Sequence, residues 1–360
     1  MLFVLIATLA LTWTGTLGTT AAVHAAGTSD ATPPPGTVIH AASCEQAPPQ
    51  SVKDRATYTP AELAHYGLPP RTPGEPFAKW AKIVRAAGKR ICDYVRSSDR
   101  WWVLIKTEGW AGFVADESSP GQNYSEADMD YYVPCTSTVN FPPTSATAVM
   151  SAWIGLGGNQ GDLKLIQTGT AAFQTYDPVQ DDWHTQYRTW VENAGYTSDR
   201  DAHYFFDVGC GAHIYVKVWG GNCMYLLDID NGVNTGNQCY GTATSGLSAE
   251  AIAERNVTDL ADYPYFADFT SVMFHGVGIT DNGSYKAMYQ VPHNKNEPYF
   301  CVRDINNRCQ GDFVGDPFAT VSDIFSDPND VPYDKYNITW QQYGPPPPSI
   351  PTKAKGGRLP

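Results

Sequence analysis

The stretch HIYVKVWGGNCMYLLDIDNG, residues 213–232, decides the fold class of this chain. Ile214, Val216 and Val218 alternate with residues of different character, which is the period of a β-strand with two distinct faces. A second alternating run follows and ends at Asp230-Asn231-Gly232, whose residue types favour a tight turn. We therefore expect an antiparallel hairpin closed by a two-residue turn.

Strand signals of the same kind extend outward from this hairpin, beginning at about residue 101. Tyr131, Val133 and Cys135 alternate with polar neighbours, and Pro142-Pro143 ends that run. The chain has 32 Gly, 27 Pro and 21 Tyr, as short strands joined by turns require, and no long helical period separates the strands. These features predict an all-β fold, an antiparallel β-sandwich of two sheets, and not a parallel sheet with crossover helices.

One helix is expected before the strands, beginning at Phe77. Apolar residues recur there at helical spacing, and basic residues occupy the other faces. The apolar positions are Phe77, Trp80, Val84, Ala87, Ile91 and Val95, and the basic positions are Lys79, Lys82, Arg85, Lys89 and Arg90. Two interpretations are open: an inhibitory pro-segment that covers an acidic cleft, or a docking helix with a solvated charged face.

The N-terminal sequence predicts export, and with it a secreted, extracellular protein. Met1 to Leu11 is almost wholly apolar, and Val23-His24-Ala25-Ala26 has the small residues of a signal-peptidase site. We expect a signal peptide at 1–25, a pro-segment with the basic helix at 26–105, the β-sandwich at 106–285, a C-terminal extension at 286–345 and a disordered tail at 346–360.

The eight cysteines fit disulfides better than a metal site, because none are spaced as CxxC. Cys301 and Cys309 could staple one hairpin, and two of Cys210, Cys223 and Cys239 could meet within one strand-rich stretch. The pairing itself does not follow from the sequence.

Composition and missing motifs exclude several classes of function. A formal net charge of -13 argues against nucleic acid or an anionic membrane as the partner. The sequence has no Gly-x-Ser-x-Gly elbow, no His-Glu-x-x-His zinc motif, no phosphate-binding loop and no Asp-Thr-Gly triplet. The histidines show no metal-ligand spacing, so we expect no cofactor and no metal. The protein is expected to be a monomer that leaves the membrane once its signal peptide is cut.

Seven short motifs follow one another between residues 110 and 269. They are Trp110-Ala111-Gly112-Phe113, Phe141-Pro142, Ala152-Trp153-Ile154-Gly155-Leu156-Gly157-Gly158, Leu165-Ile166-Gln167-Thr168-Gly169, Trp190-Val191-Glu192, Glu250-Ala251-Ile252-Ala253-Glu254 and Phe266-Ala267-Asp268-Phe269. In order and spacing this set resembles the glutamic peptidases, or eqolisins. The resemblance implies a concanavalin-like jelly roll with its substrate cleft on the concave sheet, and an acid endopeptidase made as a precursor that cleaves polypeptides.

The resemblance also implies the site residues. It assigns the catalytic pair to Gln167 and Glu254 and a wall of the substrate cleft to Trp153. The supporting Trp-x-Glu falls on Trp190 and Glu192, while Glu250 is expected to be a solvated strand residue. The sequence departs from the family at two positions, where an acidic residue is replaced by Gly157 and by Ala171.

Glu and Gln can hydrolyse a peptide bond without a metal or a nucleophilic side chain. Glu254 serves as base toward water and then as acid toward the departing amine, while the amide of Gln167 donates to the oxyanion. A Glu with an ordinary pKa near ~4.3 is partly ionised in mild acid, so this mechanism predicts an acid optimum.

Two alternatives belong to other classes of function. A glycoside hydrolase would use Glu250 and Glu254, but four residues along a regular strand span about 13 Å, against the ~5 Å of a retaining pair. A lectin-like module that binds carbohydrate without catalysis would also suit a β-sandwich with exposed aromatic residues.

Overall fold

The computed structural model describes sixteen stretches of the chain. They are residues 38–39, 53–92, 94–96, 110–116, 123–137, 148–158, 164–177, 179–194, 202–240, 244–254, 265–291, 293–296, 300–303, 309–314, 319–324 and 335–341. Contacts divide the chain into residues 1–30 and 31–360, and every described residue belongs to the second unit. The expected signal peptide and C-terminal tail lie outside the described residues. In the described part, no helix is long and apolar enough to span a bilayer.

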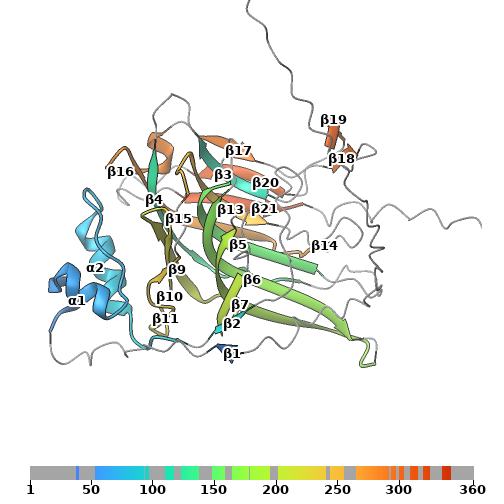
Figure 1. Ribbon diagram of the computed structural model, residues 1–360. Coiled ribbons are helices and arrows are strands. Elements are labelled where there is room, and N and C mark those ends of the chain that lie inside the picture. The colour runs from blue at the N-terminus through green and yellow to red at the C-terminus, as the bar shows by residue number, and fades with distance from the viewer. Residues whose placement is uncertain are drawn as a thin grey trace, which may run out of the picture. The chain divides into compact units, whose positions relative to one another are not determined.

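Two sheets make up the β-sandwich (Figure 1). Sheet A runs in the order β1 (Val38–Ile39), β2 (Tyr94–Arg96), β8 (Ala202–Asp207), β7 (Asp182–Ala194), β6 (Leu165–Asp177), β5 (Ala148–Gly157), β13 (Ser248–Glu254), β3 (Trp110–Asp116) and β17 (Asn294–Asn296), with β14 (Tyr265–Phe266) paired to β5. Sheet B runs β11 (Val233–Asn234), β10 (Cys223–Asp228), β9 (His213–Trp219), β4 (Tyr124–Tyr132), β15 (Ser271–Asp281), β21 (Lys335–Trp340) and β20 (Ala319–Ile324), with β12 (Gln238–Cys239) beside β10 and β16 (Ser284–Ala287) beside β15. Along both orders the neighbouring strands are antiparallel, as predicted; β14 is parallel to β5.

The main hydrophobic core lies between the two sheets. Ala152, Ile154 and Leu156 of β5 belong to it, together with Ile214 and Val216 of β9. The alternation that predicted a strand at residues 213–219 therefore sorts one set of side chains into this core. The intervening residues of β9 point to the outer face of sheet B.

The hairpin between β10 and β11 has a longer turn than expected. Leu227 pairs with Asn234 and Asp228 with Val233, so four residues connect the strands instead of two. The Asp228 carboxylate accepts from the backbone N–H of Asn231 at 3.1 Å, which supports this wider turn.

The C-terminal extension contributes strands to both sheets. β17 pairs with β3 at one edge of sheet A, and β21 pairs with β15 and β20 in sheet B. The separate hairpin of β18 (Phe300–Arg303) and β19 (Cys309–Val314) forms where Cys301 and Cys309 predicted one.

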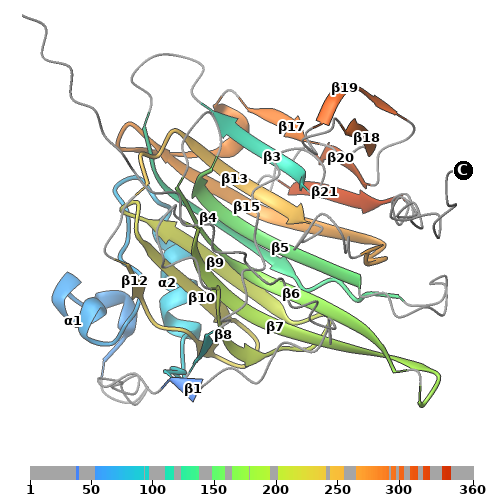
Figure 2. The ribbon, with the colours of Figure 1, turned by 45° about the vertical axis from the view of Figure 1, so that its right-hand side comes forward.

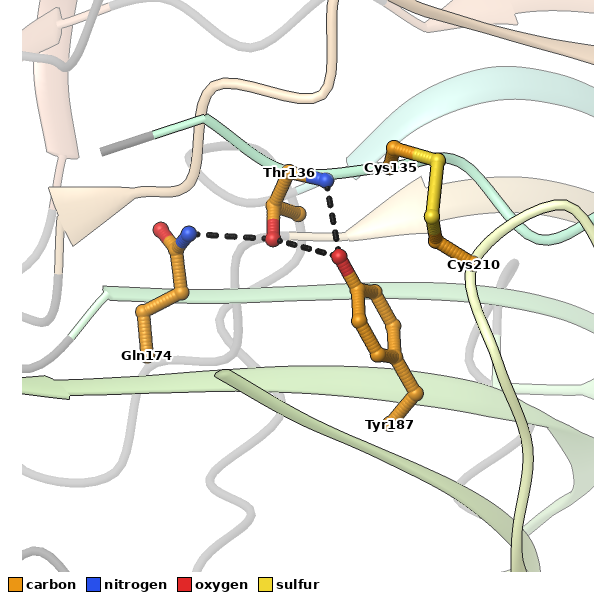
Figure 3. Close-up of a disulfide and its surroundings, with 5 residues drawn as sticks. All are labelled: Cys135, Thr136, Gln174, Tyr187 and Cys210. Atoms are coloured by element: carbon orange, nitrogen blue, oxygen red, sulfur yellow. Dashed lines mark hydrogen bonds between the residues drawn. A yellow bond between two sulfur atoms is a disulfide. The ribbon is translucent and has the colours of Figure 1, made fainter. Parts of the chain in front are cut away.

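Two disulfides join described residues to each other, and Cys92 is disulfide-bonded as well. Cys223 pairs with Cys239, so two of the three clustered cysteines do meet, and the third, Cys210, pairs with Cys135. The Cys135–Cys210 bond lies beside a polar tie between sheets (Figure 3), in which Thr136 bonds to the hydroxyl of Tyr187 at 3.0 Å and accepts from Gln174 at 3.0 Å.

The N-terminal described segment contains η1 (Arg55–Thr57), α1 (Pro60–His65) and α2 (Phe77–Ala86). The expected helix is confirmed at Phe77 but is shorter than predicted: it ends at Ala86, because the backbone N–H of Gly88 bonds to Gly232 instead of continuing the helix. In Figure 2 α2 lies beside β10, with α1 further out, and α2 packs on the outer face of sheet B.

Candidate functional site

The two predicted catalytic residues stand on the same face of sheet A. Gln167 is opposite Gly155 of β5, and Gly155 is opposite Glu250 of β13. Glu254 lies four residues further along β13, opposite Ser151. Because directly opposed residues share a face and side chains alternate along a strand, an offset of four residues keeps Glu254 on the side of Gln167. Ala152, Ile154 and Leu156 point into the inter-sheet core, so this is the outer face of sheet A.

The two residues are not adjacent. Two strand spacings and four residues separate their Cα atoms by roughly 16 Å. Each side chain has a different partner among the described residues, and no hydrogen bond there joins one to the other.

Glu254 is half-buried and held by tryptophan. The indole Nε1 of Trp153 donates to its carboxylate at 2.8 Å. Trp110 lies directly opposite Glu254 on β3, and its ring packs edge-on against Trp153 with 5.0 Å between the ring centres. Burial raises the pKa of Glu254 to about 7, and hydrogen bonds from Trp153 and Trp110 act in the opposite direction.

Two glycines make room for Trp153. A Cβ on Gly169, the register partner of Trp153 on β6, would lie 2.0 Å from the carbonyl oxygen of Ala152 and 2.7 Å from Cβ of Trp153. A Cβ on Gly155 would lie 2.8 Å from the indole ring. The glycines of two sequence motifs therefore allow the indole to lie flat enough to reach Glu254.

Gln167 is buried and bonded to Glu192. Its Nε2 donates to Oε2 of Glu192 at 2.6 Å, and the two residues are direct register partners on β6 and β7. Glu192 is fully buried. Trp190, two residues earlier on β7, is also fully buried and is the register partner of Gly169 on β6. The structure thus brings Gln167 together with Glu192 and brings Glu254 together with Trp153.

Glu250 differs from the prediction. It was expected to be a solvated strand residue, but its exposed fraction is 0%. Its surroundings differ from those expected: β13 is an internal strand of sheet A between β5 and β3, and Val114 and Gly155 are the opposed neighbours of Glu250. By register it is closer to Gln167 than Glu254 is.

The two departures from the family pattern also fall on this face. Ala171 is opposite Ser151 and therefore in the row of Glu254. Gly157 lies two residues beyond Gly155 on β5. An acidic residue at position 171 would lie two strands from Glu254, and its negative charge would raise the pKa of Glu254 further. Alanine at this position removes that charge.

The sequence analysis named Trp110 as part of a motif and assigned no individual role to it. Its pairing with Glu254 follows from the register of β3 against β13, which the sequence does not reveal.

In the part of the chain that the structure describes, no group of three or more His, Cys, Asp or Glu side chains is arranged to hold a metal ion.

Comparison with known proteins identifies the family. The model of the peptidase A4 family matches residues 108–297, which is 190 of the 360 residues. The chain belongs to the peptidase A4 family. This A4 peptidase is therefore a glutamic-type peptide hydrolase, and its substrates are polypeptides.

The A4 peptidase is also similar to solved structures of glutamic peptidases. One is scytalido-glutamic peptidase with a peptide-based transition-state analogue, at 17% identity and a TM-score of 0.44, covering 65% of this chain and 98% of that one. Another is SCP-B, an eqolisin in complex with the tripeptide Ala-Ile-His, with 17% identity, a TM-score of 0.42 and the same coverage. Aspergilloglutamic peptidase from Aspergillus niger has 20% identity and a TM-score of 0.36, covering 54% of this chain and 99% of that one. No curated protein matches the chain.

Proposed function

We propose that this A4 peptidase is an exported endopeptidase in which Glu254 activates water and Gln167 stabilises the oxyanion. The observation that supports this most directly is the hydrogen bond from Trp153 to Glu254 on the face of sheet A that also carries Gln167. The bond fixes the orientation of the carboxylate that would activate the water.

The two residues have different tasks on the same face of sheet A. Their Cα atoms are roughly 16 Å apart and side chains stand roughly perpendicular to a sheet, so the extended substrate would lie along this face between the two functional groups. Nε2 of Gln167 carries two hydrogens, of which one donates to Glu192, and we assign the other to the substrate oxygen.

The proton transfers are simple in this arrangement. Glu254 takes a proton from water as the oxygen attacks the scissile carbonyl carbon, and the carbonyl oxygen becomes negative beside the amide of Gln167. Glu254 then gives that proton to the nitrogen as the C–N bond breaks. The carboxylate returns to its ionised form, so the cycle is balanced.

We infer a working pH closer to neutrality than the acid optimum that the sequence predicted. That prediction used an ordinary carboxyl pKa, but burial raises the pKa of Glu254 to about 7. A base must be ionised to accept a proton, so activity in the free enzyme should rise with pH through that value.

Replacement of Glu254 tests the assignment. We expect Glu254→Gln to abolish cleavage of casein at every pH while circular dichroism shows an unchanged fold. Glu250→Gln is the matched control, because Glu250 is on the same strand and face. Full activity in Glu254→Gln contradicts the proposal, and loss in Glu250→Gln alone would move the catalytic role to Glu250.

We also propose that the protein is exported and proteolytically processed. The disulfides Cys135–Cys210 and Cys223–Cys239 favour an oxidising compartment. Sequencing the N-terminus of the protein recovered from the medium tests both cuts: residue 26 indicates signal cleavage alone, and a residue near 106 indicates removal of the pro-segment. Membership in a peptidase family argues against the lectin and glycoside hydrolase alternatives.

A further inference from the structure

The N-terminal segment, residues 53–92, covers the outer face of sheet B with apolar side chains. Trp80, Ile83 and Val84 of α2 share a buried cluster with Tyr225 and Leu227 of β10. All five side chains are at most 3% exposed. The outward-facing side chains of β10 are therefore not a solvated surface but one half of a second hydrophobic core.

Backbone hydrogen bonds extend this contact beyond α2. Ile91 donates to the carbonyl of Asn234 at 2.8 Å, and Asn234 donates to the carbonyl of Lys89 at 2.9 Å. The side chain of Asn237 donates to the carbonyl of Leu68 at 3.0 Å. The segment after α2 is thus attached to the residues at and beyond β11 in the manner of an added strand.

Two buried ion pairs join the N-terminal segment to sheet B, and each side contributes one of the two lysines. Lys79 of α2 pairs with Asp128 of β4 and donates to the carbonyl of Gly276 at 2.8 Å. In return, Lys217 of β9 pairs with Glu75 of the N-terminal segment at 2.9 Å. Both lysine side chains are at most 6% exposed.

Removing the N-terminal segment would leave this polar cluster incomplete. Asp128 would lose Lys79, and Lys217 would keep only Glu126 of β4, at 3.0 Å. A buried charge without its partner is strongly unfavourable, so the segment and sheet B stabilise each other.

This contact is on the other sheet from the candidate catalytic residues. Gln167 and Glu254 are on the outer face of sheet A, whereas α2 packs on the outer face of sheet B. The position of α2 therefore favours the docking helix of the two interpretations. It does not favour a helix that covers the cleft.

We propose that residues 53–92 are a permanent layer of the folded protein, which stays bound to sheet B as a separate chain when the backbone is cut between Arg96 and Trp110. The expected end of the pro-segment, residue 105, lies in this interval. The fragment would also carry β2, which pairs with β8 at the edge of sheet A. Docking on sheet B is independent of which residues perform catalysis.

A cut made after folding tests this directly. A recognition sequence for a specific protease is inserted between Arg96 and Trp110 of a full chain that carries Cys44→Ser and Cys92→Ser, so that no disulfide can join the two fragments. The cleaved protein is run on a size-exclusion column in low and in high salt. We expect both fragments in one peak at both salt concentrations, because buried pairs are little screened. Separation of the fragments under these native conditions would overturn the proposal.

A pair of lysine variants tests the role of the buried charges. Lys79→Met removes the charge that pairs with Asp128, whereas Lys82→Met makes the same change at an exposed position of the same helix. We expect the nicked Lys79→Met protein to release its N-terminal fragment at least tenfold faster than the nicked Lys82→Met protein. Equal rates would show that the ion pairs do not hold the segment, and if Lys79→Met does not fold, the result for the nicked wild type decides.

Discussion

Trp153 and Glu254 are joined by a 2.8 Å hydrogen bond from the indole N–H to a carboxylate oxygen, between neighbouring strands of sheet A. Trp153 is 101 residues from Glu254 in sequence. Glycines at positions 155 and 169 leave the space that the indole occupies. The catalytic assignment of Glu254 therefore depends on a tryptophan that serves as a hydrogen-bond donor as well as part of the apolar surface.

Loss of this donor should move the pH dependence of activity. Trp153→Phe keeps an aromatic ring but removes the N–H that stabilises the ionised form of Glu254, so its pKa rises above about 7. A hydrogen bond to a charged group contributes about 1.5–3 kcal/mol, and one pKa unit corresponds to about 1.4 kcal/mol. We expect the acid limb of the kcat/KM profile to move up by about one unit.

Trp110→Phe should shift the same limb in the same direction, because its indole also acts on the pKa of Glu254. Trp183→Phe is the control, since Trp183 packs against Tyr176 in the distal part of the β6–β7 hairpin. An unchanged acid limb in both Trp153→Phe and Trp110→Phe would mean that Glu254 is not the group whose ionisation limits activity.

Glu192 should act through Gln167 as a positioning residue. It accepts from Nε2 of Gln167 at 2.6 Å and is fully buried, so it fixes which way the amide points. We expect Glu192→Ala to lower kcat by roughly ten- to a hundredfold with little change in KM, since a charge-assisted hydrogen bond contributes about 1.5–3 kcal/mol. Glu192→Gln retains an acceptor and should recover a large part of this loss. Equal losses in the two variants would point to a packing defect instead.

Part of this architecture was predictable from the sequence. Alternation in residues 213–219 predicted a strand, and the motif order identified the family. The same alternation could not show that Lys217 is buried, because its partner Glu75 is 142 residues away in the N-terminal segment. The alternation in a sequence indicates which face of a strand a residue occupies. Whether that face is exposed to solvent depends on segments that are distant in sequence.

Contacts between residues distant in sequence also explain two wrong predictions, the end of the helix that begins at Phe77 and the solvent exposure of Glu250. The apolar spacing continued to Val95, but contacts of Gly88 and Lys89 with residues 232–234 replaced the helical hydrogen bonds after Ala86. Glu250 was expected in solvent because its neighbours in sequence did not show that its strand is internal in sheet A. Strand order and register come from pairings distant in sequence, which one sequence does not specify.

Glu126 should make the stability of the fold depend on pH. Its carboxylate contacts Lys217 at 3.0 Å and the hydroxyl of Thr72, and the carboxylates of Asp128 and Glu75 belong to the same cluster. Lys79 faces Asp128 from α2, and Tyr215 and Tyr285 donate to Asp128 as well. With Glu126 neutral, two lysines balance two carboxylates, and ionisation of Glu126 adds an unbalanced negative charge.

The sign of the effect follows from the direction of the pKa shift. Burial, opposed by Lys217, raises the pKa of Glu126 from 4.5 to about 7. Between these two values the folded protein binds a proton that the unfolded chain has lost, so this group lowers the free energy of unfolding as pH rises from 4.5 to 7. Glu126→Gln is neutral at every pH and should abolish that part of the decline.

Thermal unfolding at pH 5 and pH 8 measures the difference. We expect the apparent Tm of the wild type to fall by several degrees more than that of Glu126→Gln over this interval. Glu62→Gln is the control, because Glu62 is on the surface, where hydrogen bonds with Thr59 and Lys53 lower its pKa to about 2, and it remains ionised throughout. If wild type and Glu126→Gln lose the same number of degrees, Glu126 does not take up its proton in the folded protein, and the charge balance of the cluster depends on another of its carboxylates.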